Sequence, residues 1–330
     1  MWDFKLGTAI GLMMRTLNFV LLRLLVYIGI SIGYIIVTGV GAGIGYGIGS
    51  IFGGDGQSVG TFFGGALGFS IFGALMYWAR AWLLYMVKAA HIAVLVQLVN
   101  EQPIPEGQTH LAYGRKAVQQ RFGTSNALFG IDILIKGVVR ALSGLVSGVL
   151  NMLPGSDRLG SIIQAFLRMA LGFIDELILA RIIYTESEEP WDSAKKSLVL
   201  YGQNYKPMLK NAAWLAAIIY LLSILVFVVM LIPAGLIAYL MPGVFSGAVV
   251  IFAILLAWSI KVAVFEPLAL TCMMQVYFQT IKDQEPNPEW EAKLDGMSKQ
   301  FHKIKERAAE AFRQPEKPAP AQTPNTDVTT

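Results

Sequence analysis

The sequence has little charge and almost no cysteine or histidine. Only 15% of its 330 residues are Asp, Glu, Lys or Arg, whereas about 25% is usual in soluble domains. The single cysteine, Cys272, cannot form an internal disulfide. The three histidines are scattered, none at metal-ligand spacing from another, and the sequence contains no phosphate loop, nucleophile elbow or zinc-protease pair. These absences exclude a soluble enzyme, a secreted disulfide scaffold and a nucleic-acid binder, and we expect no metal or other cofactor.

The segments that lack charged residues are long apolar runs. Hydrophobic residues make up 55% of the chain, and the mean hydropathy is +0.56. Arg23 and Asp55 enclose 31 residues without a charged side chain, and Lys210 and Lys261 enclose 50. Because a helix needs roughly 20 apolar residues to cross a bilayer, the sequence predicts an all-α, multi-pass membrane protein.

The apolar runs divide into three hairpins, two strong and one weak. The strong hairpins turn at Gly53–Gly56 and at Met241–Gly243, where glycine and proline interrupt the helix. The first has spans within Leu24–Ser50 and over about Val59–Trp82, the latter continuing as helix to Val99, and the other lies between Asn211 and Gln279. Charges interrupt the weak pair, about Ala127–Met152 and Leu159–Tyr184. Six crossings are the preferred prediction; four crossings plus two interfacial helices are the alternative.

Basic residues fix the predicted orientation. With six crossings and the N-terminus inside, 20 of the 26 Lys and Arg residues fall in inner segments and only Arg158 falls in an outer turn. Cytoplasmic segments of membrane proteins carry such an excess. We therefore expect an inner-membrane protein with both termini in the cytoplasm.

A polar segment led by acidic residues and proline follows each hairpin. These segments begin near residues 100, 188 and 285, and each opens a helix that carries basic residues. The recurrence suggests three units of hairpin plus cytoplasmic helix, over residues 1–124, 125–210 and 211–313, before a disordered tail at 314–330 rich in Pro, Ala and Thr. The simpler alternative is that inner loops of membrane proteins commonly have this composition.

The order of these segments supports a family resemblance. The run from "GRKAVQQRFG" through "SAKKSLVLYGQNYKPMLKNA" to "VFEPLALTCMMQVYFQTIKD" resembles the C-terminal half of the choline transporter-like family over about residues 112–285. It is similar, too, to uncharacterised six-span bacterial proteins with proline-led cytoplasmic helices. The first resemblance implies a transporter.

Glycines are concentrated in the first hairpin. They recur every four residues in two ladders on the first span and one on the second: Gly39, Gly43 and Gly47; Gly41, Gly45 and Gly49; Gly60, Gly64 and Gly68. Four-residue spacing lets helix backbones approach closely, so two ladders on one helix predict two close neighbours. Packing of the two spans on each other is the simplest interpretation; a seam between copies and a flexible gating helix are the alternatives.

Charged residues within the proposed spans are the candidate binding residues. The expected set comprises Asp132, Lys136, Arg140, Arg168, Asp175, Glu176, Lys261 and Glu266, with Pro267 kinking the last span. Charges in a membrane are expensive and are usually paired or functional. Structural ion pairs, an aqueous cavity that binds an ion or small polar solute, and an interfacial hairpin are the three interpretations.

The last predicted helix, Glu289–Phe312, carries a regular apolar stripe and several lysines. It could dock on the protein itself or on an anionic inner leaflet.

The function predicted first is permease-like transport of a small polar or cationic solute. The alternative is a non-transporting scaffold that binds a membrane-complex partner, or a second copy, through the glycine-rich spans or this helix. An integral membrane enzyme ranks third.

Overall fold

The computed structural model describes residues 1–122, 126–151, 171–186, 189–240 and 245–313. These residues form twelve α-helices, joined by turns and two short segments of other helix types. Four helical segments are long and apolar enough to cross a membrane: Leu17–Phe52, Gly56–Tyr77, Tyr205–Ile232 and Ala253–Ile281. The predicted all-α fold with several membrane-crossing helices is thus confirmed in this coarse form.

The first hairpin consists of α2 (Leu17–Gly49), the short 3₁₀ helix η1 (Ser50–Phe52) and α3 (Gly56–Val99). Gly53 and Gly54 make the turn with φ of +65° and +54°, a conformation that suits glycine. The 44 residues of α3 rise about 66 Å at 1.5 Å per residue, roughly twice the thickness of the hydrocarbon core. Helix α3 is therefore much longer than one crossing requires, and the prediction of helix to Val99 is confirmed.

The second hairpin consists of α9 (Tyr205–Leu240) and a returning helix made of α10 (Phe245–Ile260), the π-helical η2 (Lys261–Phe265) and α11 (Glu266–Ile281). The predicted break at 241–243 lies outside the described residues. Pro267 has no backbone N–H to donate, so the helix must adjust before it. The wide π turn is that adjustment, and it stands where the sequence predicts a kink.

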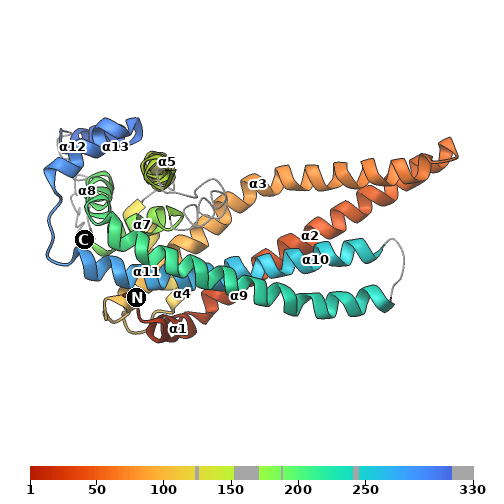
Figure 1. The fold of residues 1–330 in the computed structure, drawn as a ribbon, viewed down its shortest axis with the longest axis horizontal. Coiled ribbons are helices and arrows are strands. Elements are labelled where there is room, and N and C mark those ends of the chain that lie inside the picture. Colours follow the sequence, from red (N-terminus) through yellow and green to blue (C-terminus); the bar gives the residue numbers. More distant parts are fainter. Residues whose placement is uncertain (123–125, 152–170, 187–188, 241–244, 314–330) are drawn as a thin grey trace, which may run out of the picture.

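The remaining helices form a compact base at one end of the two hairpins (Figure 1). The base consists of α1 (Leu6–Arg15), α4 (His110–Phe122), α5 (Asn126–Asn151), α7 (Ile174–Tyr184), α8 (Pro190–Gln203), α12 (Pro288–Met297) and α13 (Lys299–Arg313). Four of these helices, α1, α4, α7 and α8, contact the ends of α3 or α11, where Ile92, Leu95 and Tyr277 are fully buried. The base therefore has a core like that of a soluble helical domain, whereas the hairpins expose apolar side chains.

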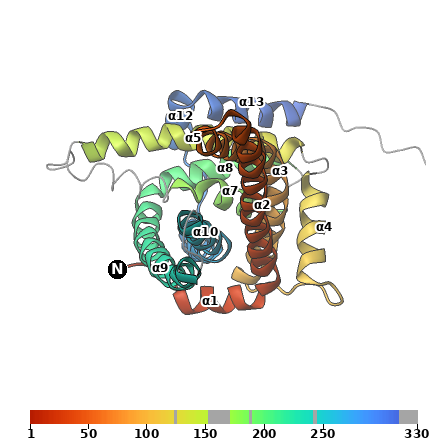
Figure 2. The same ribbon diagram turned by 90° about the vertical axis from the view of Figure 1, so that its right-hand side faces the viewer.

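Helix α5 differs from the preferred six-crossing prediction. Figure 1 shows α5 nearly end-on while the hairpins run across the view, and Figure 2 shows it along its length, so α5 lies across the hairpin direction. The 11 residues of α7 rise only about 16 Å, and residues 152–170 lie outside the described residues. Charges on α5 favour such a position beside polar groups over a place in the hydrocarbon. The arrangement agrees with the alternative of four crossings plus interfacial helices.

Proline opens two of the helices that follow the hairpins, as predicted. Pro190 is the first residue of α8, and Pro288 is the first residue of α12. The Asn287 side chain accepts a hydrogen bond of 2.7 Å from the Glu289 backbone N–H, which caps α12. The first proline-led segment differs, because α4 begins only at His110.

The predicted last helix is divided into α12 and α13 at Ser298, whose backbone is extended. The hydroxyl oxygen of Ser298 accepts a hydrogen bond of 3.2 Å from the Phe301 N–H and so caps α13. The apolar stripe nevertheless continues across the break and is covered by α5 and α8, its buried members being Leu294, Phe301, Ile304 and Ala308. Docking on the protein itself is the outcome, rather than docking on a membrane. The predicted tail from residue 314 lies outside the described residues.

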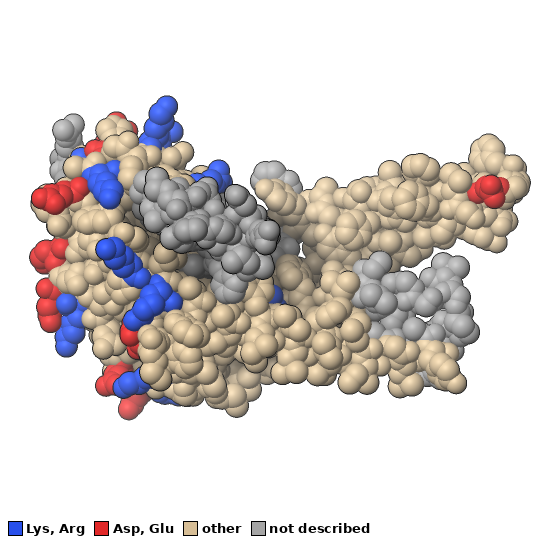
Figure 3. Space-filling model, in the orientation of Figure 1, with Lys and Arg blue, Asp and Glu red and all other residues tan. Residues whose placement is uncertain are grey.

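Charge separates the two ends of the molecule. On the face shown in Figure 3, Lys, Arg, Asp and Glu gather on the base, and the hairpins are almost bare of them. Asp55, which precedes α3, is the one charged residue in the turn at the far end of the first hairpin. This is the distribution expected of helices that cross a membrane from a cytoplasmic base.

Candidate functional site

A cavity of about 500 Å³ lies where the two hairpins meet the base. We call it the hairpin cavity; α2, α3 and the α10–η2–α11 helix line it, and its size is typical of small-molecule sites. Its walls away from the base are apolar and aromatic and include Ile30, Tyr34, Met76, Tyr77, Leu255 and Trp258. Its charged residues, which lie at the end nearer the base, are Arg23, Lys88, Lys136, Glu176 and Glu266.

Arg23 is the least satisfied charge in this cavity. Its residue is 7% exposed, and its Nη2 has no hydrogen-bond partner among the described residues. None of the ion pairs in the described part of the chain includes it. Because a buried charge without a partner is strongly unfavourable, an acceptor from outside the chain would complete this site.

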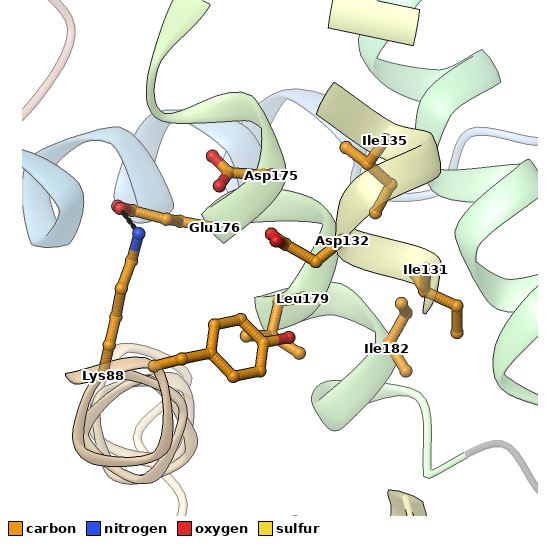
Figure 4. Close-up of a pocket in the computed structure, with 9 residues that line it drawn as sticks. Lys88, Ile131, Asp132, Ile135, Asp175, Glu176, Leu179 and Ile182 are labelled. Atoms are coloured by element: carbon orange, nitrogen blue, oxygen red, sulfur yellow. Dashed lines mark ion pairs between the residues drawn. The ribbon is translucent and has the colours of Figure 1, made fainter. Parts of the chain in front are cut away.

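Lys88 of α3 and Glu176 of α7 form an ion pair (Figure 4), and both residues line the hairpin cavity together with Arg23. Burial raises the pKa of Glu176, and this effect outweighs the opposite one of Lys88. Burial by itself would lower the pKa of Lys88, but Glu176 and Asp175 raise it above its ordinary value. The pair therefore fastens α3 to the base through groups that depend on each other for their charge.

A second, much smaller cavity of about 10 Å³ lies on the other side of this pair, among α3, α5 and α7. Asp132, Asp175 and Glu176 approach it from two helices, as Figure 4 shows. Asp132 pairs with Lys136 over 2.5 Å, as its i, i+4 spacing predicts. Burial raises the pKa of Asp132 more than Lys136 lowers it. The space suffices for about one water molecule.

The candidate residues from the sequence are gathered only in part. Asp132, Lys136, Asp175 and Glu176 lie together around the small cavity and the Lys88 pair. Lys261 and Glu266 pair over 3.1 Å across the π turn, and Glu266 lines the hairpin cavity. Arg140 is exposed farther along α5, and Arg168 lies outside the described residues.

Two of the most important charges, Arg23 and Lys88, were missing from that set. Both belong to the 20 Lys and Arg residues that the sequence places in the predicted inner segments. A signal was available on α2, where Arg23, Tyr27, Ser31 and Tyr34 follow one another at steps of 4, 4 and 3 and so share one face. All four line the hairpin cavity.

One of the two glycine ladders on α2 packs against α3. A Cβ placed on Gly41, Gly45 or Gly49 would collide with a backbone carbonyl of α3; the α3 glycines that face them are Gly56, Gly60 and Gly64. Gly68 likewise faces the carbonyl of Val37. The two backbones are therefore in direct contact, as the packing prediction requires.

The other ladder faces away from the rest of the described chain. A Cβ on Gly39, Gly43 or Gly47 would meet no atom within 4 Å. Within the described residues only α3 approaches the α2 glycines, so the second close neighbour stays a prediction. The reason is geometric: the ladders are offset by two residues, about 200° around the helix, so one neighbour cannot touch both.

His91 and Cys272 have structural roles. His91 is fully buried and stacks on Phe19, with Nε2 at 3.0 Å from the Thr16 hydroxyl. Burial lowers the pKa of His91 well below its ordinary value, so the ring is neutral. Cys272 is buried in the core. The described residues contain no group of three or more His, Cys, Asp or Glu that could hold a metal ion.

Comparison with known proteins found no matching family model, curated protein or solved structure. The resemblance to choline transporter-like proteins therefore stays a prediction, and the hairpin cavity is the feature of this chain that bears on its function.

Proposed function

We propose that this multi-pass membrane protein binds a small polar solute in the hairpin cavity and moves it in the manner of a permease. The observation that carries the proposal is a cavity of about 500 Å³ that reaches buried charges at the junction of membrane and base. The charge left without a hydrogen-bond partner there belongs to a cation, Arg23. A polar or anionic solute therefore fits better than the cationic one that the sequence also suggested.

In the proposed arrangement the protein lies in the inner membrane and crosses it four times. Helices α5 and α7 lie at the cytoplasmic boundary of the membrane, and both termini are in the cytoplasm. The turns at 50–56 and 241–244 contain no Lys or Arg, which supports their outer position. Within this arrangement the threefold repeat is retained in modified form: α4, α8 and α12 each follow a hairpin, and the middle hairpin is interfacial.

The proposal can be tested by the access of water to the hairpin cavity. In a Cys272→Ala background, single cysteines at Ser31 and Lys136 would report on the depth and the mouth of the cavity. Ser31 is buried, yet it lines the cavity beside Ser259. We expect a charged, water-soluble thiol reagent added from the cytoplasmic side to label both positions.

A cysteine at Val40 is the matched control, since Val40 is 58% exposed on the same helix but lies outside the cavity. In the membrane it would face lipid and resist the reagent. Labelling at Lys136 without labelling at Ser31 would contradict a water-filled path, and the transport proposal would be abandoned.

A non-transporting scaffold is the second candidate function. The observation in its favour is that six charges where the hairpins meet the base are paired with one another, as Lys88–Glu176, Asp132–Lys136 and Lys261–Glu266. The open ladder of Gly39, Gly43 and Gly47 would then be the contact surface for a partner helix. A dry cavity in the labelling experiment favours this function.

A further inference from the structure

We infer that the hairpin cavity binds the phosphate head group of an anionic phospholipid from the inner leaflet, with Arg23 as the group that recognises it. The inference rests on the proposed role of the cavity as a binding site, but it does not require transport. Three properties of the cavity lead to it: its depth, the nature of its walls and the charge at its end.

The depth of Arg23 matches that of a lipid head group. From Gly49, at the outer end of α2, to Arg23 the helix rises about 39 Å, which exceeds the roughly 30 Å of the hydrocarbon core. Arg23 therefore stands near the inner boundary of the membrane, where the phosphates of the inner leaflet lie.

The length of the cavity matches one leaflet. On α2 its lining runs from Arg23 through Tyr27, Ile30 and Ser31 to Tyr34, a rise of about 17 Å. Half of a 30 Å hydrocarbon core is about 15 Å. Above the charged end, the walls contributed by α3 and α10 are apolar and aromatic, with Met76, Leu255 and Trp258 among them. A cavity that is charged at one end and apolar over the length of an acyl chain fits an amphiphile whose head group lies at the charged end.

The charge at the inner end selects an anion. Lys88 has its own carboxylate in Glu176, and Glu266 has its own ammonium group in Lys261. Arg23 lies near enough to Glu176 and Glu266 to interact with their charges but forms no ion pair with either, and its buried Nη2 has no hydrogen-bond partner among the described residues. A guanidinium group offers two parallel N–H donors that match the oxygens of a phosphate. The unpaired donor thus favours a phosphate whose charge is not already balanced by a cation within the same head group, as in phosphatidylglycerol, over the phosphate of a zwitterionic lipid.

The test measures lipid bound to the full chain purified in a neutral detergent. Native mass spectrometry would count phosphatidylglycerol and phosphatidylcholine bound at matched concentrations, and inorganic phosphate would be added as a soluble competitor. We expect phosphatidylglycerol to bind about tenfold more tightly than phosphatidylcholine, and millimolar inorganic phosphate to leave it in place. Equal binding of the two lipids, or full displacement by inorganic phosphate, would overturn the inference; displacement would identify a site for a soluble anion instead.

Arg23→Gln removes the proposed recognition group, and Arg15→Gln is the matched control because Arg15 is an exposed arginine of α1 in the same base. We expect Arg23→Gln to lower the preference for phosphatidylglycerol about tenfold, Arg23→Lys to lower it by less, and Arg15→Gln to leave it unchanged. Unchanged preference in folded Arg23→Gln would overturn the inference. If Arg23→Gln fails to fold, the preference of Arg23→Lys for phosphatidylglycerol is compared with that of the natural chain. An unchanged preference would again overturn the inference.

The two proposals fail separately. Labelling of a cysteine at Ser31 without selective phosphatidylglycerol binding keeps the aqueous path and overturns the lipid site. Selective lipid binding without labelling at Ser31 keeps the lipid site and overturns the path for a soluble solute.

Discussion

Lys88 and Glu176 join the long helix α3 to the base helix α7 through an ion pair at the end of the hairpin cavity. The Lys88 side chain is 31% exposed and the Glu176 side chain 12%, and both residues line both cavities. Neither charge has the same environment without the other, so the pair should be treated as one unit in mutagenesis.

Removal of Lys88 alone should destabilise the protein. Lys88→Met leaves the Glu176 carboxylate without its partner, and loss of one member of a buried pair typically costs about 3 kcal/mol or more. The double variant Lys88→Met/Glu176→Gln should recover part of that loss, because no charge is then stranded. Thermal unfolding of the purified variants in detergent checks this expectation; a double variant less stable than Lys88→Met would contradict it.

The pH dependence of Lys88→Met follows from the direction of the Glu176 shift. Burial already raises the pKa of Glu176, and loss of Lys88 should raise it further. Above the ordinary glutamate pKa of about 4.3, the folded state then binds a proton that the unfolded chain releases, so stability falls as pH rises. Lys88→Met should therefore lose more stability between pH 5 and pH 8 than Lys88→Met/Glu176→Gln, as measured by unfolding temperature. Parallel pH curves would contradict the assignment.

The two glycine ladders should respond differently to substitution. Gly45→Leu would drive a side chain into the backbone carbonyl of Gly60, and overpacking of this kind typically costs about 1–3 kcal/mol. Gly43→Leu on the same helix meets open space and serves as the control. We expect Gly45→Leu to lower folded yield and unfolding temperature, and Gly43→Leu to leave both near those of the natural chain. A larger loss from Gly43→Leu would show that its face is also packed, by a partner helix or a second copy.

Topology separates four crossings from six. Tags at the two termini and at Gln108 should report the cytoplasm, and tags at Gln57 and Ser246 should report the outer side, in either arrangement. A tag at Ser156 is decisive because it follows α5, which we place at the inner boundary. We expect protease protection assays to find Ser156 in the cytoplasm; an outer location would restore the six-crossing prediction.

The apolar stripe of α13 should contribute to stability rather than to membrane binding. Phe301 is fully buried against the base, and truncation of a buried aromatic typically costs about 3–5 kcal/mol. Phe301→Ala should therefore lower the unfolding temperature sharply, whereas Lys303→Ala, at an exposed position of the same helix, should not. If Lys303→Ala lowered the unfolding temperature more than Phe301→Ala, contacts between the exposed lysines and lipid would be what holds this helix in place.

The hairpins were predictable from the sequence because length, hydropathy and turn residues determine them locally. The α2–α3 turn, the continuation of α3 to Val99 and the proline starts of α8 and α12 are properties of short segments. The Asp132–Lys136 and Lys261–Glu266 pairs were foreseeable for the same reason, since their members lie within five residues of each other.

The site was less predictable because its central contacts join residues far apart in the chain. Lys88 and Glu176 are 88 residues apart, and their sequence neighbourhoods give no sign that they meet. Arg23 looked like an ordinary flanking residue, because burial by α3 and by the π turn of the second hairpin is a tertiary effect. The crosswise position of α5 depends similarly on its contacts with α13 and α7 rather than on its hydropathy.

The continuity of α3 has a mechanical consequence. One helix without interruption runs from the outer turn into the core of the base, and the glycine contacts clamp α2 along it with no side chains between them to yield. The backbone hydrogen bonds of α3 run through this whole length, so one helix joins the first hairpin to the base. We therefore expect a change in the tilt of the first hairpin to be transmitted along α3 to the base. The separation of the two hairpins and the repacking of the base around Lys88 and Glu176 would be a single movement.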